Sequence, residues 1–159
     1  QNRPCNPVRN NGEGPFSFLL DTGARGLNLS DDLTDELGLE PDERYVVQVD
    51  DFSIGAASFQ DLLLPLRDNV RVSQVSKRRV DGFIGSLFLS DFTLTIDYPD
   101  HSIRITDEQA EYATEPAVMR ICNGYPLVAV QIQDSSVWFL VDTGTSKCIV
   151  STELSEQVP

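Results

Sequence analysis

Two aspartates in this chain of 159 residues are each followed by Thr-Gly. Asp21 lies in "FLLDTGARGLNLS" (residues 18–30) and Asp142 in "FLVDTGTSKCIVS" (residues 139–151), in both cases at the end of an apolar run. An ionised carboxylate beside such a run is costly to bury unless another group pairs with it or uses it. Two sites of this kind in one chain predict that the two carboxyl groups act together.

Paired carboxyl groups have a defined chemistry. Two aspartates within hydrogen-bonding distance do not both ionise, so they share one proton and titrate as a coupled pair. The ionised member takes a proton from a water molecule while the protonated member polarises a carbonyl group. Such a pair hydrolyses an amide without a covalent intermediate, and the sequence predicts neither a metal nor another cofactor.

The residues after each aspartate are predicted to support this pair. The glycines, Gly23 and Gly144, allow a tight turn and a close approach to the partner loop. The hydroxyl groups of Thr22 and Thr143 can each donate and accept a hydrogen bond, so we expect them to brace the two loops against each other. The alternative is that both runs are ordinary turns, in which Asp and Gly are common. That alternative does not explain why the runs recur in register.

The two sites belong to a longer internal repeat. An offset of 121 residues, the spacing of the two aspartates, aligns residues 18–37 with 139–158 and gives seven identities in twenty positions. Each copy predicts a strand, a Gly-containing turn, a second short strand and a helix. The predicted strands are Phe16–Leu20 and Leu27–Leu29 in the first copy, and Val137–Val141 and Cys148–Val150 in the second.

Ser30 and Ser151 are predicted to be the N-caps of the two helices. Serine is a favoured N-cap residue, and acidic residues in the first turn, such as Asp31 and Asp32, interact favourably with the helix dipole. We therefore interpret the acidic residues of these helices as structural and not as metal ligands.

The rest of the chain predicts a mainly β fold with short helices. A short helix is expected at Ser86–Ser90, and a polar, acidic stretch from Thr106 to Glu115 is typical of a linker. The residues 127–132 alternate apolar side chains and open the second copy. The further predicted strands, rich in β-branched and aromatic residues, are Tyr45–Val49, Phe52–Ile54, Phe59–Leu66, Val70–Val75, Phe92–Asp97 and Ser102–Ile105.

The composition excludes several classes of protein. A formal net charge of −13 disfavours binding to nucleic acid, and no apolar run reaches the length of about 20 residues that a membrane span needs. The basic residues Arg71 and Lys77-Arg78-Arg79 are interpreted as an exposed loop or strand end. The single histidine, His101, is expected in a solvent-facing turn and has no matching nucleophile motif for a serine or cysteine hydrolase.

The three cysteines, Cys5, Cys122 and Cys148, lack metal-like spacing and allow at most one internal disulfide, with three possible pairings. The compartment stays open, although a first residue other than Met and an acidic composition favour an exported protein.

The quoted motifs resemble those of the retropepsin-like aspartic peptidases, in particular bacterial forms with two tandem repeats, and more distantly those of pepsin. The resemblance runs from about Gly14 to Ile105 and includes "GPFSFLLDTGA", "DELGL" and "DGFIGSLFLSDFTLTIDY". It implies a β-barrel lobe and a peptide or protein substrate, with Asp21 and Asp142 as the catalytic pair. It also implies that a strand containing Phe83, Ile84 and Gly85 passes through the loop that carries the catalytic aspartate.

The resemblance predicts a first lobe over residues 1–106, a linker over 107–120 and the beginning of a second, truncated lobe over 121–159. Three features depart from the family pattern. The second copy has no apolar-apolar-Gly element after its helix. The region between Leu39 and Phe52, where the family has a Gly-rich flap, is short and contains no glycine. The opening strand of the first copy, "PCNPVRN", is poor in apolar residues.

These features leave three hypotheses. The first is an aspartic endopeptidase in which Asp21 and Asp142 of one chain form the pair. The second keeps the chemistry but pairs Asp21 with its equivalent in a second chain, as in the retroviral enzymes, which requires a homodimer. The third is a non-catalytic module that uses the same fold to bind peptides or to dimerise.

Overall fold

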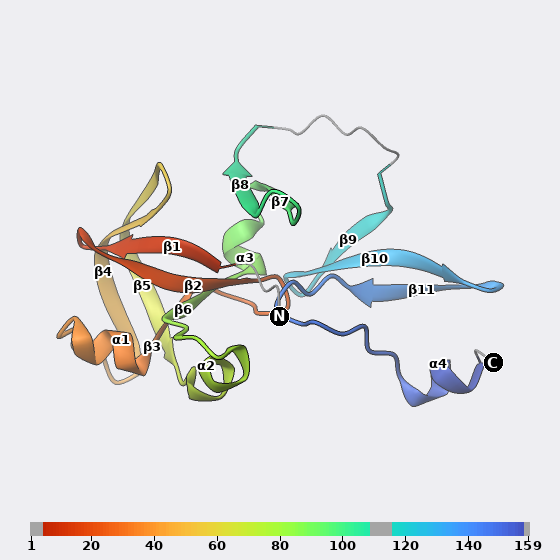
Figure 1. The fold of residues 1–159 in the computed structure, drawn as a ribbon, viewed down its shortest axis with the longest axis horizontal. Coiled ribbons are helices and arrows are strands. Elements are labelled where there is room, and N and C mark those ends of the chain that lie inside the picture. The colour runs from red at the N-terminus through yellow and green to blue at the C-terminus, as the bar shows by residue number, and fades with distance from the viewer. Residues whose placement is uncertain (1–4, 109–115, 158–159) are drawn as a thin grey trace.

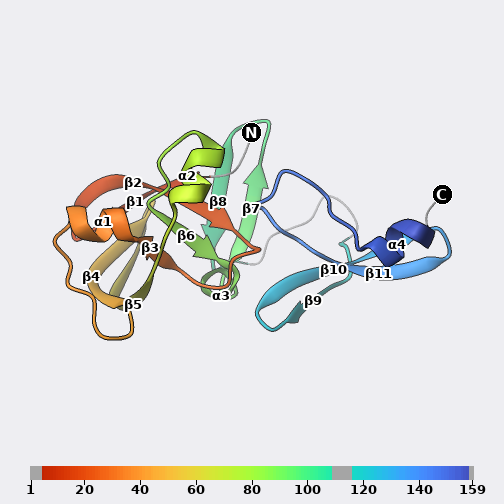
Figure 2. The ribbon, with the colours of Figure 1, turned by 90° about the horizontal axis from the view of Figure 1, so that it is seen from below.

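The computed structural model describes residues 5–108 and 116–157. They form a barrel from the first half of the chain and a smaller three-stranded sheet from the second half (Figure 1). These two parts lie at opposite ends of the molecule in both views (Figures 1 and 2). The fold is the mainly β, retropepsin-like lobe that the sequence predicts.

The barrel is closed, with the strand order β1-β2-β6-β3-β5-β4. Strand β6 pairs in parallel with β2 and antiparallel with β3, so it lies between the strand before the first Asp-Thr-Gly run and the strand after it. The strands are β1 (Cys5–Asn10), β2 (Glu13–Asp21), β3 (Asn28–Ser30), β4 (Val46–Ile54), β5 (Ala57–Arg67) and β6 (Gly82–Gly85).

The barrel core explains why the chain folds around the first Asp-Thr-Gly run. Phe18, Leu19 and Leu20 of β2 are at most 1% exposed, so both faces of the strand end are covered. A fully buried side chain of this size contributes about 1.5–3 kcal/mol. Asp21 is therefore attached to the most deeply buried strand end of the barrel, and its position is set by that packing.

Three helices accompany the barrel: α1 (Asp31–Glu36), α2 (Val70–Ser76) and α3 (Ser86–Leu89). Helix α1 begins where the sequence predicts, because the side chain of Ser30 accepts a hydrogen bond from the backbone N–H of Leu33 at 3.1 Å. Helix α3 follows β6 directly and covers the predicted range Ser86–Ser90 except for its last residue.

The predicted strand Val70–Val75 is wrong, because these residues form helix α2. The valines of this segment favour a strand by local preference, yet Val72 packs against the buried cluster around Leu19 and Val80. The helix ends at Lys77, which has the left-handed conformation. The two predicted strands Tyr45–Val49 and Phe52–Ile54 are one continuous strand, β4.

The second half contains β9 (Met119–Cys122), β10 (Tyr125–Ile132), β11 (Ser135–Leu140) and α4 (Thr152–Gln157). Strand β9 begins within residues 107–120, the predicted linker, of which residues 109–115 lie outside the described residues. Helix α4 starts 121 residues after α1, and the hydroxyl of Ser151 accepts from the N–H of Leu154 at 3.2 Å. The predicted strand Cys148–Val150 is wrong, because these residues have no partner strand within the described part of the chain.

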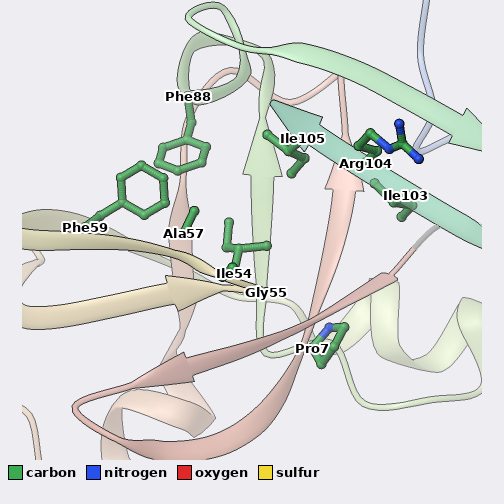
Figure 3. Close-up of a pocket in the computed structure, with 10 residues that line it drawn as sticks. Pro7, Ile54, Gly55, Ala57, Phe59, Phe88, Ile103, Arg104 and Ile105 are labelled. Carbon is green, nitrogen blue, oxygen red and sulfur yellow. The ribbon is translucent and has the colours of Figure 1, made fainter. Parts of the chain in front are cut away.

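A hairpin of β7 (Thr93–Asp97) and β8 (Ser102–Thr106) lies against one side of the barrel. Between β8 and the β4–β5 turn lies an apolar cavity of about 390 Å³, with Phe59, Phe88 and Ile105 in its lining (Figure 3). Neither aspartate of the two Asp-Thr-Gly runs lines this cavity. Among the residues that the structure describes, no helix is long and apolar enough to cross a membrane.

Candidate active site

The structure brings the two Asp-Thr-Gly runs together. Asp21 is the last residue of β2, and its Oδ1 accepts hydrogen bonds from the backbone N–H groups of Gly23 at 3.0 Å and Ala24 at 3.1 Å. Asp142 follows β11, and its Oδ1 accepts from the N–H of Gly144 at 2.8 Å. Each carboxyl group is therefore oriented by its own turn, with two amide donors in the first loop and one in the second.

The glycines lie directly against the opposite carboxyl groups. A Cβ atom added to Gly23 would lie 2.4 Å from Cγ of Asp142, and one added to Gly144 would lie 2.4 Å from Cγ of Asp21. Real Cβ atoms do not approach a carbon this closely. Glycine at these two positions therefore allows a close approach of the loops that a residue with a Cβ atom would hinder.

The two threonines link the loops by reciprocal hydrogen bonds. Oγ1 of Thr22 accepts from the N–H of Thr143 at 3.1 Å and donates to the carbonyl oxygen of Val141. Oγ1 of Thr143 accepts from the N–H of Thr22 at 3.1 Å and donates to the carbonyl oxygen of Leu20 at 2.8 Å. Because Thr22 is only 8% exposed, these bonds are partly shielded from water and fix the two loops relative to each other.

The pKa of Asp21 is shifted as expected for one of two carboxyl groups that share a proton. Burial raises the pKa of Asp21 above its ordinary value, and the charge of Asp142 and a hydrogen bond to it raise that pKa further. The N–H groups of Gly23 and Ala24 lower it by a smaller amount. The proximity of the two carboxyl groups thus favours a state of the pair in which one proton is shared.

Strand β6 supports the first aspartate. Its residues pair in parallel with the end of β2, so that Leu20 lies beside Ile84 and Asp21 beside Gly85. Gly85 has no room for a side chain, since an added Cβ would lie 2.6 Å from the carbonyl oxygen of Gly26. Phe83 and Ile84 are buried at 3% and 0% exposure. All three residues therefore hold the loop that carries Asp21 from behind.

Asp81 and Ser86, at the two ends of this strand, were not singled out in the sequence. The carboxylate of Asp81 accepts from the N–H of Ser17 at 2.7 Å and from Arg79, and it is 4% exposed. Ser86 donates its hydroxyl to the carbonyl oxygen of Ala24 at 3.0 Å. The signal for Asp81 was present, because "VDGF" places a carboxylate directly after an apolar residue, as "LLDT" does.

The remaining candidates lie away from the pair. His101 is in the exposed turn between β7 and β8, as expected. The thiols of Cys122 and Cys148 are exposed and unbonded, while the side chain of Cys5 lies outside the described residues. The basic residues lie on α2 and after it, where Arg79 forms ion pairs with Glu36 and Asp81.

The described residues contain no metal-binding cluster, since no group of three or more His, Cys, Asp and Glu side chains is placed to hold a metal ion. Residues 39–45 form a loop that leads into β4. Strand β4 then pairs with β5 in a hairpin whose turn follows Ile54.

Comparison with protein families gives a match, which covers the barrel and includes Asp21 but not Asp142. A family profile described as aspartyl protease matches residues 6–88, which is just over half of the chain and spans the barrel through α3. The chain therefore belongs to the aspartyl protease family. A comparison of the sequence with curated proteins gives no match.

Proposed function

We propose that this protein is an aspartic endopeptidase that hydrolyses peptide bonds with a water molecule activated between Asp21 and Asp142. The observation that carries the proposal is the mutual close approach of each carboxyl group to the glycine of the opposite loop. A pair of turns with a structural role alone has no need to bring two acidic groups together, because that approach raises the pKa of one of them.

The proposed mechanism assigns a different role to each carboxyl group. The ionised member of the pair takes a proton from the attacking water as the general base. The member that holds the shared proton donates a hydrogen bond to the carbonyl oxygen of the substrate and stabilises the negative charge that develops there. The general base then gives the proton that it took from the water to the leaving amine as the C–N bond breaks. Thr22 and Thr143 position the two loops and do not touch the substrate in this scheme.

The proposal includes a tandem arrangement of two related units in one chain. The first lobe is residues 1–106, and residues 121–159 begin a second, with 107–120 between them. This tandem arrangement is supported by the offset of 121 residues that the two copies share. Strands β10 and β11 and helix α4 correspond, in the same order, to β1, β2 and α1, and each helix has a serine N-cap.

Substitution of one aspartate tests the proposal. Asp21→Asn should lower the rate of cleavage of an unfolded protein substrate at mildly acidic pH by about 100- to 10,000-fold, the range expected for loss of a general acid. The matched control is Asp31→Asn, which removes an exposed carboxylate from α1 and should leave the rate unchanged. Full activity in Asp21→Asn would exclude Asp21 from the mechanism.

A second candidate function is a non-catalytic peptide-binding or dimerisation module. It is favoured by the loop at residues 39–45, which does not form the Gly-rich flap of the family pattern, since a site without a lid excludes water poorly. Binding of a statine-type compound, which mimics the hydrated peptide bond, distinguishes the two candidates. We expect it to bind the wild-type chain and to lose affinity in Asp21→Asn.

A further inference from the structure

Helix α2 and the residues on either side of it concentrate positive charge in an acidic chain. Residues 67–79 contain five of the twelve basic residues and a single acidic residue, whereas the whole chain has a net charge of −13. One of the five, Arg79, is paired with acidic neighbours. In contrast, Arg67, Arg71 and Lys77 are exposed and form no ion pair with the acidic side chains that the structure describes.

The alternation of side chains along β2 places Asp21 on the face of the barrel that this segment covers. Successive side chains of a strand point to opposite faces. Phe18 and Leu20 belong to the barrel core, whereas Leu19 belongs to a second buried cluster. Asp21 comes two residues after Leu19, so its side chain lies on the same face as the second cluster.

Helix α2 packs on this second cluster. The members of the cluster come from β2, from the loop after it and from the segment that contains β6: Leu19, Ala24, Val80 and Phe83. Val72 of α2 packs against them, and the hydroxyl of Ser73 accepts a hydrogen bond from the N–H of Val80 at 3.0 Å. The helix lies beside β6 in both views (Figures 1 and 2). Because Ala24 also donates its N–H to Asp21, the helix borders the loop that carries the first aspartate.

Arg67 holds one positive charge at a defined place near the pair. Its guanidinium lies over the ring of Phe83, 5.0 Å from the ring centroid, and an aromatic ring restrains a cation in this position. Phe83 is two residues before Gly85, which pairs with Asp21. Two residues of a strand span about 7 Å, so a few residues of extended substrate are enough to reach from the pair to Arg67.

We propose that Arg67, together with the charges of Arg71 and Lys77, selects substrates that carry acidic side chains a few residues from the scissile bond. The inference rests on the proposed function and names the substrate class of the same site. A guanidinium and a carboxylate form a charge-assisted and often bidentate pair. The acidic remainder of the chain repels an anionic peptide, so this face is the place to which such a peptide is directed.

An acidic polypeptide fits this face better than a nucleic acid or a membrane does. Both of those partners present an extended array of negative charge, which a protein with a net charge of −13 repels over most of its surface. A short acidic segment of an extended peptide needs only the few cations beside the pair.

The cleavage preference of the full chain tests the proposal. The chain is incubated with a pool of proteome-derived peptides at about pH 6, where Asp and Glu side chains are ionised, and mass spectrometry identifies the cut sites. We expect acidic residues to be enriched on one side of the cut, within about five positions of it. Arg67→Glu should shift the preference at those positions toward Lys and Arg by about tenfold, because it replaces an attraction by a repulsion of similar size.

Arg67→Gln and Arg9→Gln form a matched pair of variants. Each removes one exposed arginine, but Arg9 lies beside the β1–β2 turn, at the end of β2 opposite to Asp21. Arg67→Gln should lower kcat/KM for a peptide with an acidic flank by about fivefold and leave it unchanged for the same peptide with a neutral flank. Arg9→Gln should change neither value. An equal loss for both peptides in Arg67→Gln would mean that the arginine has only a structural role, and the proposal would fail.

Binding measured without cleavage separates this inference from the proposed function. A fluorescein-labelled peptide with consecutive Glu residues beside an apolar core is titrated into the full chain carrying Asp21→Asn, and its anisotropy reports binding. We expect saturable binding that Arg67→Gln in the same chain weakens by about fivefold. If this result holds but the wild-type chain cleaves no peptide, the proposed function fails and the site for acidic peptides stands.

Two results would overturn the inference. The first is cleavage by the wild-type chain with no preference for acidic flanks, which leaves the proposed function intact. The second is binding of a single-stranded oligonucleotide that depends on Arg67 and is tighter than binding of the acidic peptide, which would make nucleic acid the partner of this face.

Discussion

Gly23 and Gly144 determine how closely the two carboxyl groups can approach. An added methyl group at either position would overlap the opposite carboxyl group, so that group must move away. We expect Gly23→Ala and Gly144→Ala to lower the cleavage rate by about 100-fold, because a misplacement of about 1 Å has an effect of this size.

Gly26→Ala is the control for this prediction. Gly26 lies in the same loop as Gly23, yet an added Cβ there meets nothing within 4 Å. The cleavage rate of this variant should therefore stay near the wild-type value. If Gly23→Ala retained full activity with substrate, the close approach of the two loops would have no role in the reaction.

The proton held by Asp21 should make folding stability depend on pH. Burial and Asp142 raise the pKa of Asp21 above 3.8 in the folded chain, so the folded state binds more protons than the unfolded state just above that pH. The free energy of unfolding therefore decreases as the pH rises from 3.8 through the raised pKa.

Asp21→Asn removes this titration, so the variant should gain stability relative to the wild type as the pH rises from 3.5 to 7. Urea unfolding of both proteins at several pH values measures the difference. An identical pH dependence in the two proteins would show that Asp21 is not perturbed by its partner. Glu40→Gln, which changes an exposed carboxylate, is the control.

Much of this pair could be predicted from the sequence, because the signal was local and occurred twice. The types and spacing of Asp, Thr and Gly in each run define what each loop can do by itself. The contacts between the loops depend on how the two halves of the chain meet, which no window of the sequence contains. The sequence also did not predict the asymmetry of the amide donors, with Ala24 donating to Asp21 in the first loop.

The helices that follow the two loops offer a comparison of one local motif in two surroundings. Ser30 is 4% exposed and caps a helix that buries Leu33 in the barrel core. Ser151 makes the same bond to the N–H of Leu154, but it is exposed. We expect Ser30→Ala to lower the free energy of unfolding by about 1–2 kcal/mol.

Ser151→Ala should lower it by less than about 0.5 kcal/mol, because surface changes away from a packed core have small effects. Thermal or urea unfolding of the two variants gives the comparison directly. Equal losses would mean that the second helix is packed as well as the first, contrary to its exposure.

Helix α2 shows why the sequence predicted a strand where the structure has a helix. Val70, Val72 and Val75 are β-branched, and their local preference is for a strand. The structure makes a helix because Val72 packs against a buried cluster and the hydroxyl of Ser76 bonds to the carbonyl oxygen of Val72 at 2.7 Å. In contrast, β2 was predicted from its continuous apolar run, which ends at an aspartate, whereas β6 was expected only from the resemblance to the family.

The two halves of the chain also meet away from the aspartates. The turn between β9 and β10 lies against α3, where an added Cβ at Gly124 would lie 2.7 Å from the side chain of Leu87. Together with the threonine bonds, this contact places both members of the pair within one polypeptide. The arrangement distinguishes a single-chain site from one assembled across a two-fold axis, and this distinction can be tested with inactive chains.

Asp21→Asn and Asp142→Asn should each be inactive, and a mixture of the two should stay inactive if each site uses both aspartates of one chain. In a dimeric site made of two Asp21 side chains, Asp142→Asn would keep its activity without mixing. In a site that pairs Asp21 of one chain with Asp142 of another, some mixed dimers would contain two intact aspartates at one interface and would recover part of the wild-type rate. The cleavage rate of the mixture, measured over a range of protein concentrations, decides between them. We expect no recovery, and a wild-type rate per chain that does not change on dilution, because the threonine bonds form within one chain. Recovery that increases with concentration would establish a dimeric site instead.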